Sequence, residues 1–288
     1  MNFLLLFFSM AASAMITVGS RLYRAKTAGC ADADSLYNFL VPASATLGWL
    51  ILFLIDPAFD WRILPYSVGY GVGYTCFTVG MLGALKHGPT SVTALVKQLA
   101  LVGVSVWGFV FWDTPITAVA IVGLFLIVLS LALCLLKPEE SNGHALGKWA
   151  FYALLITIGN AGCSIIQRYQ QMAFDYQYKN AFMMLGVLSS ALACLAIGLG
   201  GERRDWGRAF RRGWYGPCLA GACSAGANVC ILLLIKRQVS STVIYPGVAV
   251  GGLCLTTLVS FFFFHERLRP LAWLGLAIGA VALVLLNL

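Results

Sequence analysis

The chain has 288 residues, of which 60% are hydrophobic and 10% are charged, and its mean hydropathy is +0.86. Soluble domains carry about 25% charged residues, so this composition excludes an ordinary soluble protein and predicts an integral membrane protein. The formal net charge of +8 is spread over the ends of apolar segments and forms no patch for nucleic acid.

Apolar segments of membrane-spanning length recur along the whole chain. They are residues 2–20, 35–55, 65–85, 90–112, 115–136, 149–174, 181–200, 214–235, 241–264 and 271–287. The polar links between them are too short to fold as separate domains. The first segment lacks a basic start like that of a signal peptide, so we expect it to be retained as a helix. The sequence therefore predicts an all-α polytopic membrane protein with ten transmembrane helices.

Small polar residues recur every three or four positions along the first segment, at Ser9, Ser13, Thr17 and Ser20. A second stripe with similar spacing follows the sixth segment, at Asn160, Ser164, Gln167 and Gln171. An offset of 147 residues places Ser13 on Asn160 and Thr17 on Ser164. Asn and Gln side chains in a membrane helix need partners or water, so the second stripe is the stronger indication of a polar interior.

The third and eighth segments are rich in glycine, which allows close approach between membrane helices. Each ends in a basic pair, Lys86-His87 and Lys236-Arg237, and the two pairs are 150 residues apart. The same offset places Asn228 on Thr78.

The fourth segment carries Lys97 and Gln98 near its middle. A lysine at the centre of a lipid-facing helix costs roughly 2.5 to 3.5 kcal/mol, so such a residue usually faces a bundle interior or a water-filled cavity. Lys97 shares a helix face with Thr93 and Trp107. We predict a polar site inside the membrane; the alternatives are that Lys97 snorkels to a headgroup layer or pairs with an acid.

In the ninth segment Pro246 precedes Gly247, and this pair either breaks the helix at a transport site or makes an ordinary proline kink. Asp113 and Glu266 occupy the turns after the fourth and ninth segments, where we expect them to be structural.

The order of these features repeats after five segments. We therefore predict a first five-helix repeat at 1–137, a linker at 138–147 and a second five-helix repeat at 148–288. Because five is odd, the second repeat must be inverted in the membrane, with a pseudo-two-fold axis in the membrane plane.

The segment TVIYPGVAVGGLCLTTLVSFFFFHERLRPLAWLGLAIGAVALVLL resembles the helix 9 to helix 10 signature of the drug/metabolite transporter (DMT) superfamily, in particular its EamA-like ten-helix members. Pro246, the Glu266-Arg267-Leu268 turn and Gly275 stand where that signature has them, and LGALKHGPTSVTALV resembles the corresponding junction of the first half. The resemblance implies a secondary transporter of small metabolites that works by alternating access. Many relatives have a Glu-Pro pair or a neutral residue in mid-helix 4, and Lys97-Gln98 departs from that pattern. This departure argues against export of cations or proton-coupled multidrug transport.

We expect a secondary carrier that moves a small polar solute, anionic or zwitterionic, through a central cavity. Lys97 would attract the carboxylate or phosphate of the solute. The other predicted substrate-binding residues are Ser13, Thr17, Tyr74, Thr93, Gln98, Trp107, Asn160, Ser164, Gln167, Asn228 and Tyr245. In an alternative mechanism Lys97 is neutral in the empty site and gains a proton with the solute, which would couple transport to protons.

Two other function classes stay open: a flippase for lipid-linked substrates, with the basic 203–212 link holding an anionic headgroup, and a non-transporting membrane scaffold or sensor. An enzyme is disfavoured because the three histidines, His87, His144 and His265, lie at helix ends or in links, with no nucleophile-base pair. The nine cysteines are expected to pack in the spans, and neither a metal nor a cofactor is predicted. The expected location is the bacterial cytoplasmic (inner) membrane, where lipid is the surrounding partner.

Basic residues are unequally divided between the two sides of the predicted topology. The links on the side of the termini hold four, Arg62, Lys179, Lys236 and Arg237. The other side holds thirteen, which are Arg21, Arg24, Lys26, Lys86, Lys137, Lys148, Arg203, Arg204, Arg208, Arg211, Arg212, Arg267 and Arg269. We expect both termini on one face; the resemblance implies the cytoplasmic face, whereas the charge distribution favours the outer one.

Overall fold

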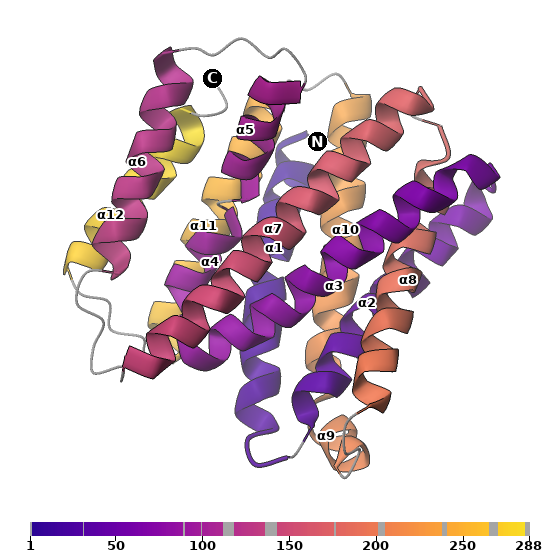
Figure 1. Cartoon of the computed structure of the whole chain (residues 1–288), viewed down its shortest axis with the longest axis horizontal. Coiled ribbons are helices and arrows are strands. Elements are labelled where there is room, and N and C mark those ends of the chain that lie inside the picture. Colours follow the sequence, from indigo (N-terminus) through magenta and orange to yellow (C-terminus); the bar gives the residue numbers. More distant parts are fainter. Residues whose placement is uncertain are drawn as a thin grey trace.

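The structure, a computed structural model, describes residues 2–30, 32–88, 90–98, 100–111, 118–135, 143–175, 177–200, 205–237, 241–264 and 270–285. Within these ranges the chain is all-helical and no strand occurs. The long helices pack into one bundle (Figure 1).

The helices follow the apolar segments of the sequence. Their bounds are α1 Asn2–Lys26, α2 Ala33–Ile55, α3 Leu64–His87, α4 Thr90–Gln98, α5 Ala100–Phe111, α6 Ala118–Leu135, α7 Gly143–Ala173, α8 Lys179–Leu199, α9 Trp206–Gly213, α10 Tyr215–Lys236, α11 Ser241–Phe264 and α12 Pro270–Leu285, with a 3-10 turn, η1, at Trp61–Ile63.

Among the described residues, five helical stretches are long and apolar enough to cross a membrane: Asn2–Lys26, Ala33–Ile55, Trp61–His87, Leu146–Ala173 and Lys179–Leu199. The chain is therefore an all-helical integral membrane protein. The number of ten spans, the repeat boundaries at 1–137 and 148–288 and the inverted arrangement stay predictions.

Two polar links contain more helix than the sequence analysis expected. α7 begins at Gly143, inside the predicted linker 138–147, because the residues after it include Ala145 and Leu146, which favour helix. The link at 201–213 contains the short helix α9, in which Trp206, Ala209 and Phe210 recur at helical spacing. The helical surface thus extends beyond the apolar segments at one end of the bundle.

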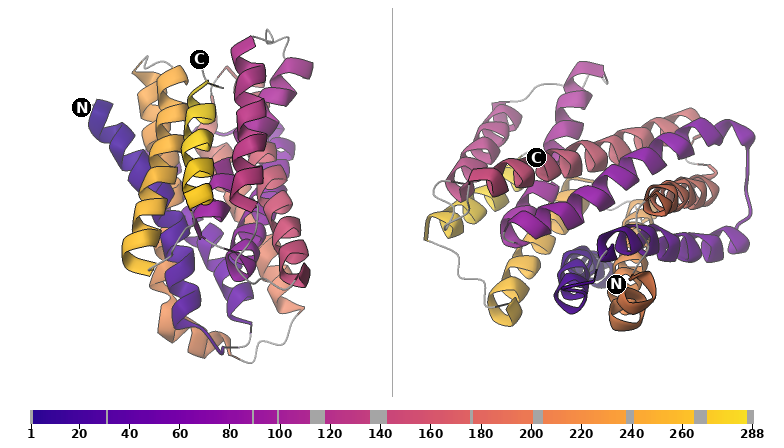
Figure 2. Two further views of the ribbon diagram at one scale, coloured as in Figure 1. Left: turned by 90° about the vertical axis from the view of Figure 1, so that its left-hand side faces the viewer. Right: turned by 60° about the horizontal axis from the view of Figure 1, so that its bottom comes forward.

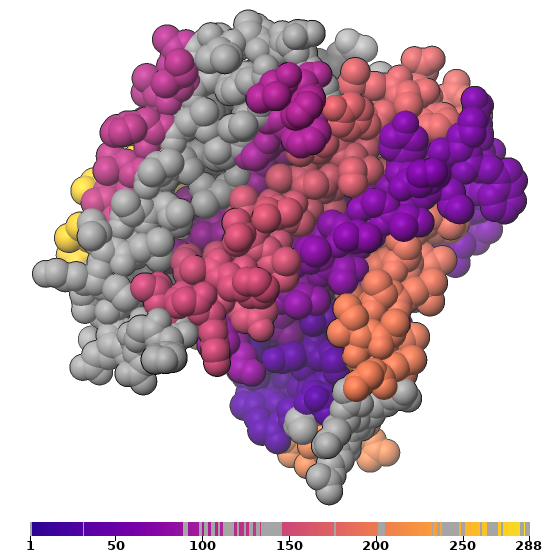
Figure 3. Space-filling model, in the orientation of Figure 1, coloured from indigo at the N-terminus to yellow at the C-terminus, as the bar shows by residue number. Residues whose placement is uncertain are grey.

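The helices pack in a pattern that joins early and late parts of the chain. α3 lies along α7, and α1 lies along α10. α2 packs on α8, α4 on α11, and α6 on α12, the last pair at the left of Figure 1. α7 and α3 run side by side across the face shown in Figure 3.

Glycine permits two of these crossings. A methyl group at Gly71 of α3 would overlap the Ser189 side chain and the Gly186 carbonyl oxygen of α8. A methyl group at Gly221 of α10 would overlap the Ser44 side chain and lie close to the backbone of α2. Because Gly71 and Gly221 carry no side chain, the helix backbones can approach closely at these two crossings.

α1 begins and α12 ends at the same end of the bundle (Figures 1 and 2). The opposite end holds the last turn of α1, with Arg24 and Lys26, and the basic helix α9. There Lys86, at the end of α3, lies 3.8 Å from the carboxylate of Asp34 on α2.

Candidate functional site

Lys97 lies in the last turn of α4, and only 8% of it is exposed. Its ammonium donates hydrogen bonds from Nζ to the carbonyl oxygen of Ser13, at 3.2 Å, and to the Ser13 Oγ, at 3.0 Å. Among the described residues, no carboxylate lies within ion-pair distance of this ammonium. The side chain therefore points into the bundle toward α1, and neutral oxygens hold it.

A third helix joins α1 and α4 at this point. The Asn160 side chain of α7 donates a hydrogen bond from Nδ2 to the Lys97 carbonyl oxygen, at 3.1 Å. This hydrogen bond ties the backbone of α4 to α7. We call Ser13, Lys97 and Asn160 the Lys97 node, since it is the place where α1, α4 and α7 meet.

The threonines predicted beside Lys97 are buried. Thr93 lies one turn earlier in α4, and its Oγ1 accepts a hydrogen bond from the indole Nε1 of Trp149 on α7, at 3.4 Å. Thr17, one turn after Ser13 on α1, is buried as well. Polar side chains thus extend from the Lys97 node along both α1 and α4.

The remaining predicted residues lie further along α7, or on α5 where it contacts α7. Ser164 donates to the Asn160 carbonyl oxygen at 3.1 Å, and Gln167 is half-buried. Trp107 of α5 donates from Nε1 to the Tyr169 hydroxyl at 3.2 Å and stacks on Phe111. Trp107 is therefore fixed against α7.

Tyr74 and Asn228 meet at a different residue, Ser224 of α10. The Tyr74 hydroxyl donates to the Ser224 Oγ at 3.1 Å, and the Asn228 amide donates to the Ser224 carbonyl oxygen at 2.9 Å. Tyr74 is buried and stacks on Tyr70. Ser224 was not among the residues predicted from the sequence, although it lies 150 residues after Tyr74, which is the offset that relates α3 to α10.

Two predicted site residues, Gln98 and Tyr245, and two acids predicted to be structural, Asp113 and Glu266, cannot be placed. The side chains of Gln98 and Tyr245 lie outside the part of the chain that the structure describes, as do Asp113 and Glu266 entirely. The backbone of α11 is helical from Ser241 to Phe264, so the helix continues through Pro246 and is not broken there.

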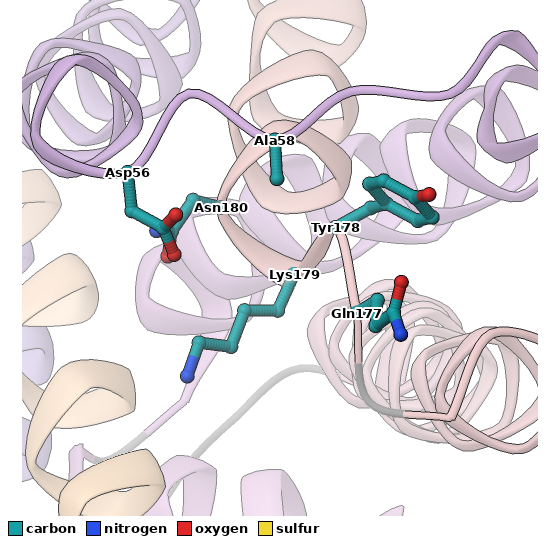
Figure 4. A pocket seen from close by; sticks show the side chains of 6 residues that line it. All are labelled: Asp56, Ala58, Gln177, Tyr178, Lys179 and Asn180. Atoms are coloured by element: carbon teal, nitrogen blue, oxygen red, sulfur yellow. The ribbon is translucent and has the colours of Figure 1, made fainter.

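A polar pocket of about 330 Å³ opens at the end of the bundle where the termini lie (Figure 4). It lies between the link that follows α2 and the link that precedes α8, and its lining residues are Asp56, Ala58, Gln177, Tyr178, Lys179 and Asn180. Asp56 and Asn180 lie on one side of it, whereas Tyr178 and Gln177 lie on the other.

The charged residues among those that line this pocket are one carboxylate, Asp56, and one ammonium, Lys179. The nearby Arg62 is already paired with Asp60, at 2.7 Å, and its hydrogen bonds hold the pKa of the Asp60 carboxyl below the usual range. Asp56 and Lys179 form no ion pair among the described residues. Such a pair of charges suits a zwitterion. The sequence signal for this pocket is that two polar links fall on the same side of the predicted topology.

Neither described pocket is lined by the Lys97 node. The second one, of about 210 Å³, is apolar and lies between α6 and α12, lined by Leu126, Ala277, Ile278 and Val281. The predicted central cavity is neither of these two pockets. At the node the Lys97 ammonium lies against Ser13.

The fold and the buried ammonium together define the class: an all-helical integral membrane protein with a polar site between its helices. No model of a known protein family matches the chain, and no curated protein matches it. Among 28 matching chains of solved structures, one described only as the crystal structure of a protein has a TM-score of 0.66 and 11% sequence identity, over 98% of this chain and 94% of its own. At this identity the likeness shows a shared fold and no function.

Proposed function

We propose that this protein is a secondary-active transporter of a small anionic or zwitterionic solute. The observation that carries the proposal is the buried ammonium of Lys97, which contacts Ser13 and has no carboxylate beside it among the described residues. A buried charge costs several kcal/mol unless an opposite charge and hydrogen bonds compensate it. A carboxylate or phosphate on the solute would supply that charge.

Alternating access needs two halves that can exchange roles, and we propose ten spans in two inverted five-helix repeats. The packing supports this arrangement, because exchanging each long helix for its counterpart in the other half reproduces the pattern. The α3–α7 contact becomes the α10–α1 contact. The α2–α8, α4–α11 and α6–α12 contacts each join a helix to its own counterpart, so the exchange leaves them unchanged.

Individual residues follow the same relation. Tyr74 and Ser224 are 150 residues apart, the offset between α3 and α10, and they bond to each other. A residue that touches its own counterpart lies on a two-fold axis. Gly71 and Gly221 have the same separation, and each abuts a serine of the neighbouring helix, Ser189 or Ser44. These contacts support a pseudo-two-fold axis near Tyr74.

The mechanism follows from the node. In the empty protein Ser13 holds the Lys97 ammonium, and the arriving anion takes its place, which frees α1 from α4. Asn160 keeps the backbone of α4 on α7 during the exchange. Because a lysine can lose its proton when no counter-charge is present, proton coupling through Lys97 is the alternative mechanism.

The ten-helix arrangement and the alternating-access mechanism are those of the drug/metabolite transporter superfamily, EamA-like branch, to which we assign the chain as part of this proposal. The location we propose is the bacterial cytoplasmic membrane. The basic end of the bundle, with Arg24, Lys26 and α9, would face the cytoplasm, because basic links are retained on that side.

A thermal-shift screen of the purified protein against a metabolite library tests the proposal first. A ligand at 100 times its dissociation constant should add about 2.7 kcal/mol of stability. The hits are then tested for uptake into proteoliposomes. Stabilisation by carboxylates or phosphates together with uptake supports a carrier, whereas binding without uptake would favour a sensor. A screen in which only lipid-linked compounds act would favour the flippase.

A further inference from the structure

The short helix α9 is fixed to the basic end of the bundle. Its buried side includes Ala209, which has no exposed surface, and Gly213, which lies against Tyr23 of α1 and Thr27, the residue after α1. The indole Nε1 of Trp206 donates to the Ser35 Oγ of α2 at 3.0 Å. α9 is therefore docked across the ends of two membrane-spanning helices.

The other side of α9 is exposed and combines cations with aromatic rings. Three arginines, Arg208, Arg211 and Arg212, are exposed. Phe210 is 45% exposed and Trp214, the residue after the helix, is 49% exposed, and their rings stack with centroids 6.4 Å apart. The exposed rings are next to the arginines in sequence, so the surface is both apolar and cationic.

The described acids near this surface do not balance its cations: Asp32 and Asp34 lie at the start of α2, and Asp34 lies 3.8 Å from Lys86. Arg208 lies 3.4 Å from the carboxylate of Asp205, which is the one acid among the described residues from 205 to 237. Lys26, from the last turn of α1, adds a further cation, which lies 5.1 Å from the Tyr215 ring centroid. The positive charge is therefore in excess.

The position of α9 places this surface at the membrane boundary. α8, a membrane-spanning helix, ends at Leu199, and α10 begins at Tyr215, two residues after α9 ends. Tryptophan and phenylalanine with flanking arginines are typical of helices that lie in the headgroup layer. The exposed rings would insert among the lipid chains while the guanidinium groups remain at the level of the phosphates.

We propose that α9 and Lys26 form a binding surface for the phosphate headgroups of anionic phospholipids in the adjoining leaflet. Charge complementarity selects this occupant, because the surface offers guanidinium groups to phosphates and apolar rings to acyl chains. Anionic lipids are concentrated in the cytoplasmic leaflet, where the charge distribution of the chain places this end. The lipid bound here holds the basic end at a fixed depth and is distinct from the solute at Lys97.

The test measures lipid binding by the full-length protein in a neutral detergent. Phosphatidylglycerol and phosphatidylcholine with identical acyl chains are titrated separately, and bound lipid is counted by native mass spectrometry. We expect the wild-type protein to bind phosphatidylglycerol at least tenfold more tightly. The triple variant R208Q/R211Q/R212Q should lose that preference, since each basic residue near an anionic surface contributes about fivefold in affinity.

A matched control removes three basic residues from the opposite end, R62Q/K179Q/R237Q, and should keep the preference. Equal binding of the two lipids by the wild type, or an unchanged preference in the α9 triple variant, would overturn the proposal. So would an equal loss in the control, since net charge rather than α9 would then be responsible.

A second measurement does not depend on the folding of the triple variant. Brominated phosphatidylglycerol quenches tryptophan fluorescence at short range, and the difference between wild type and W214F isolates the signal of Trp214. We expect that signal to be quenched more strongly by brominated phosphatidylglycerol than by brominated phosphatidylcholine. Absence of quenching by either lipid would contradict the proposed position in the headgroup layer.

Discussion

Two regions of this molecule hold basic residues in opposite ways. At the basic end, the arginines of α9 are exposed, and Arg208 lies beside Asp205. At the Lys97 node, one ammonium is buried with oxygens of Ser13 for partners. An exposed cation costs little and contributes little to stability. A buried one without a counter-charge is costly, so its presence calls for a functional explanation.

The largest expected effect comes from Lys97→Met, which removes the buried charge and keeps an apolar side chain of similar length. The solute should lose roughly 2 to 5 kcal/mol of binding energy, as is typical when one partner of a buried charge pair is removed. The empty protein should keep or gain stability, because replacing a buried charge by an apolar group relieves its desolvation. Uptake into proteoliposomes and thermal unfolding measure the two effects. Wild-type uptake by this variant would remove Lys97 from the mechanism.

Supplying a counter-charge within the protein should act almost as strongly. In Ser13→Asp, a carboxylate replaces the hydroxyl that contacts the Lys97 ammonium at 3.0 Å. We expect the empty protein to unfold at a higher temperature and the anionic solute to bind at least tenfold more weakly, which is about 1.4 kcal/mol. Ser13→Asn is the matched control without charge and should bind the solute more tightly than Ser13→Asp does. Equal affinities in the two variants would contradict competition for the ammonium.

Lys97→Arg separates charge from proton exchange. Arginine stays protonated, so this variant should keep part of the solute binding while losing any transport that requires Lys97 to release a proton. Solute binding is compared with uptake driven by a pH gradient. Gradient-driven uptake at the wild-type rate would exclude proton coupling through this residue.

The glycine crossings test the proposed symmetry. Gly71→Ala and Gly221→Ala each force a methyl group onto a serine of the neighbouring helix, so each should lower stability by about 1 to 3 kcal/mol. Gly162→Ala on α7 is the control, because nothing lies within 4 Å of the added methyl group. Thermal unfolding measures all three. A large effect at only one of the two crossings would argue against equivalent positions in two repeats.

The smallest effect is expected from Asn160→Ala. It removes the hydrogen bond to the Lys97 carbonyl oxygen and should cost about 1 kcal/mol in stability. Solute affinity should fall less than in Lys97→Met, since Asn160 holds the backbone of α4 and does not supply the charge. A loss as large as that of Lys97→Met would show that Asn160 contacts the solute directly.

The sequence predicted the all-helical membrane fold because apolar length is a local property, readable without knowing which helices touch. It also predicted that Lys97 faces the interior, since the cost of the alternative is large. It did not predict that Ser13 would be the partner of Lys97, or that Tyr74 and Asn228 would meet at Ser224, because those contacts depend on helix rotation and crossing angle. α9 was missed as a helix because its eight residues fall in a polar link, where only span-length apolar segments were taken as helices.

The most direct test of the central claim compares the charge on the solute with the charge on Lys97. Once a solute is identified, its affinity and that of an uncharged analogue, with an amide in place of the carboxylate or an ester in place of the phosphate, are measured for wild type and Lys97→Met. If the anion pairs with Lys97, removing the solute's charge should weaken binding at least tenfold in the wild type and have little effect in Lys97→Met. The same loss in both proteins would show that the anionic group binds elsewhere.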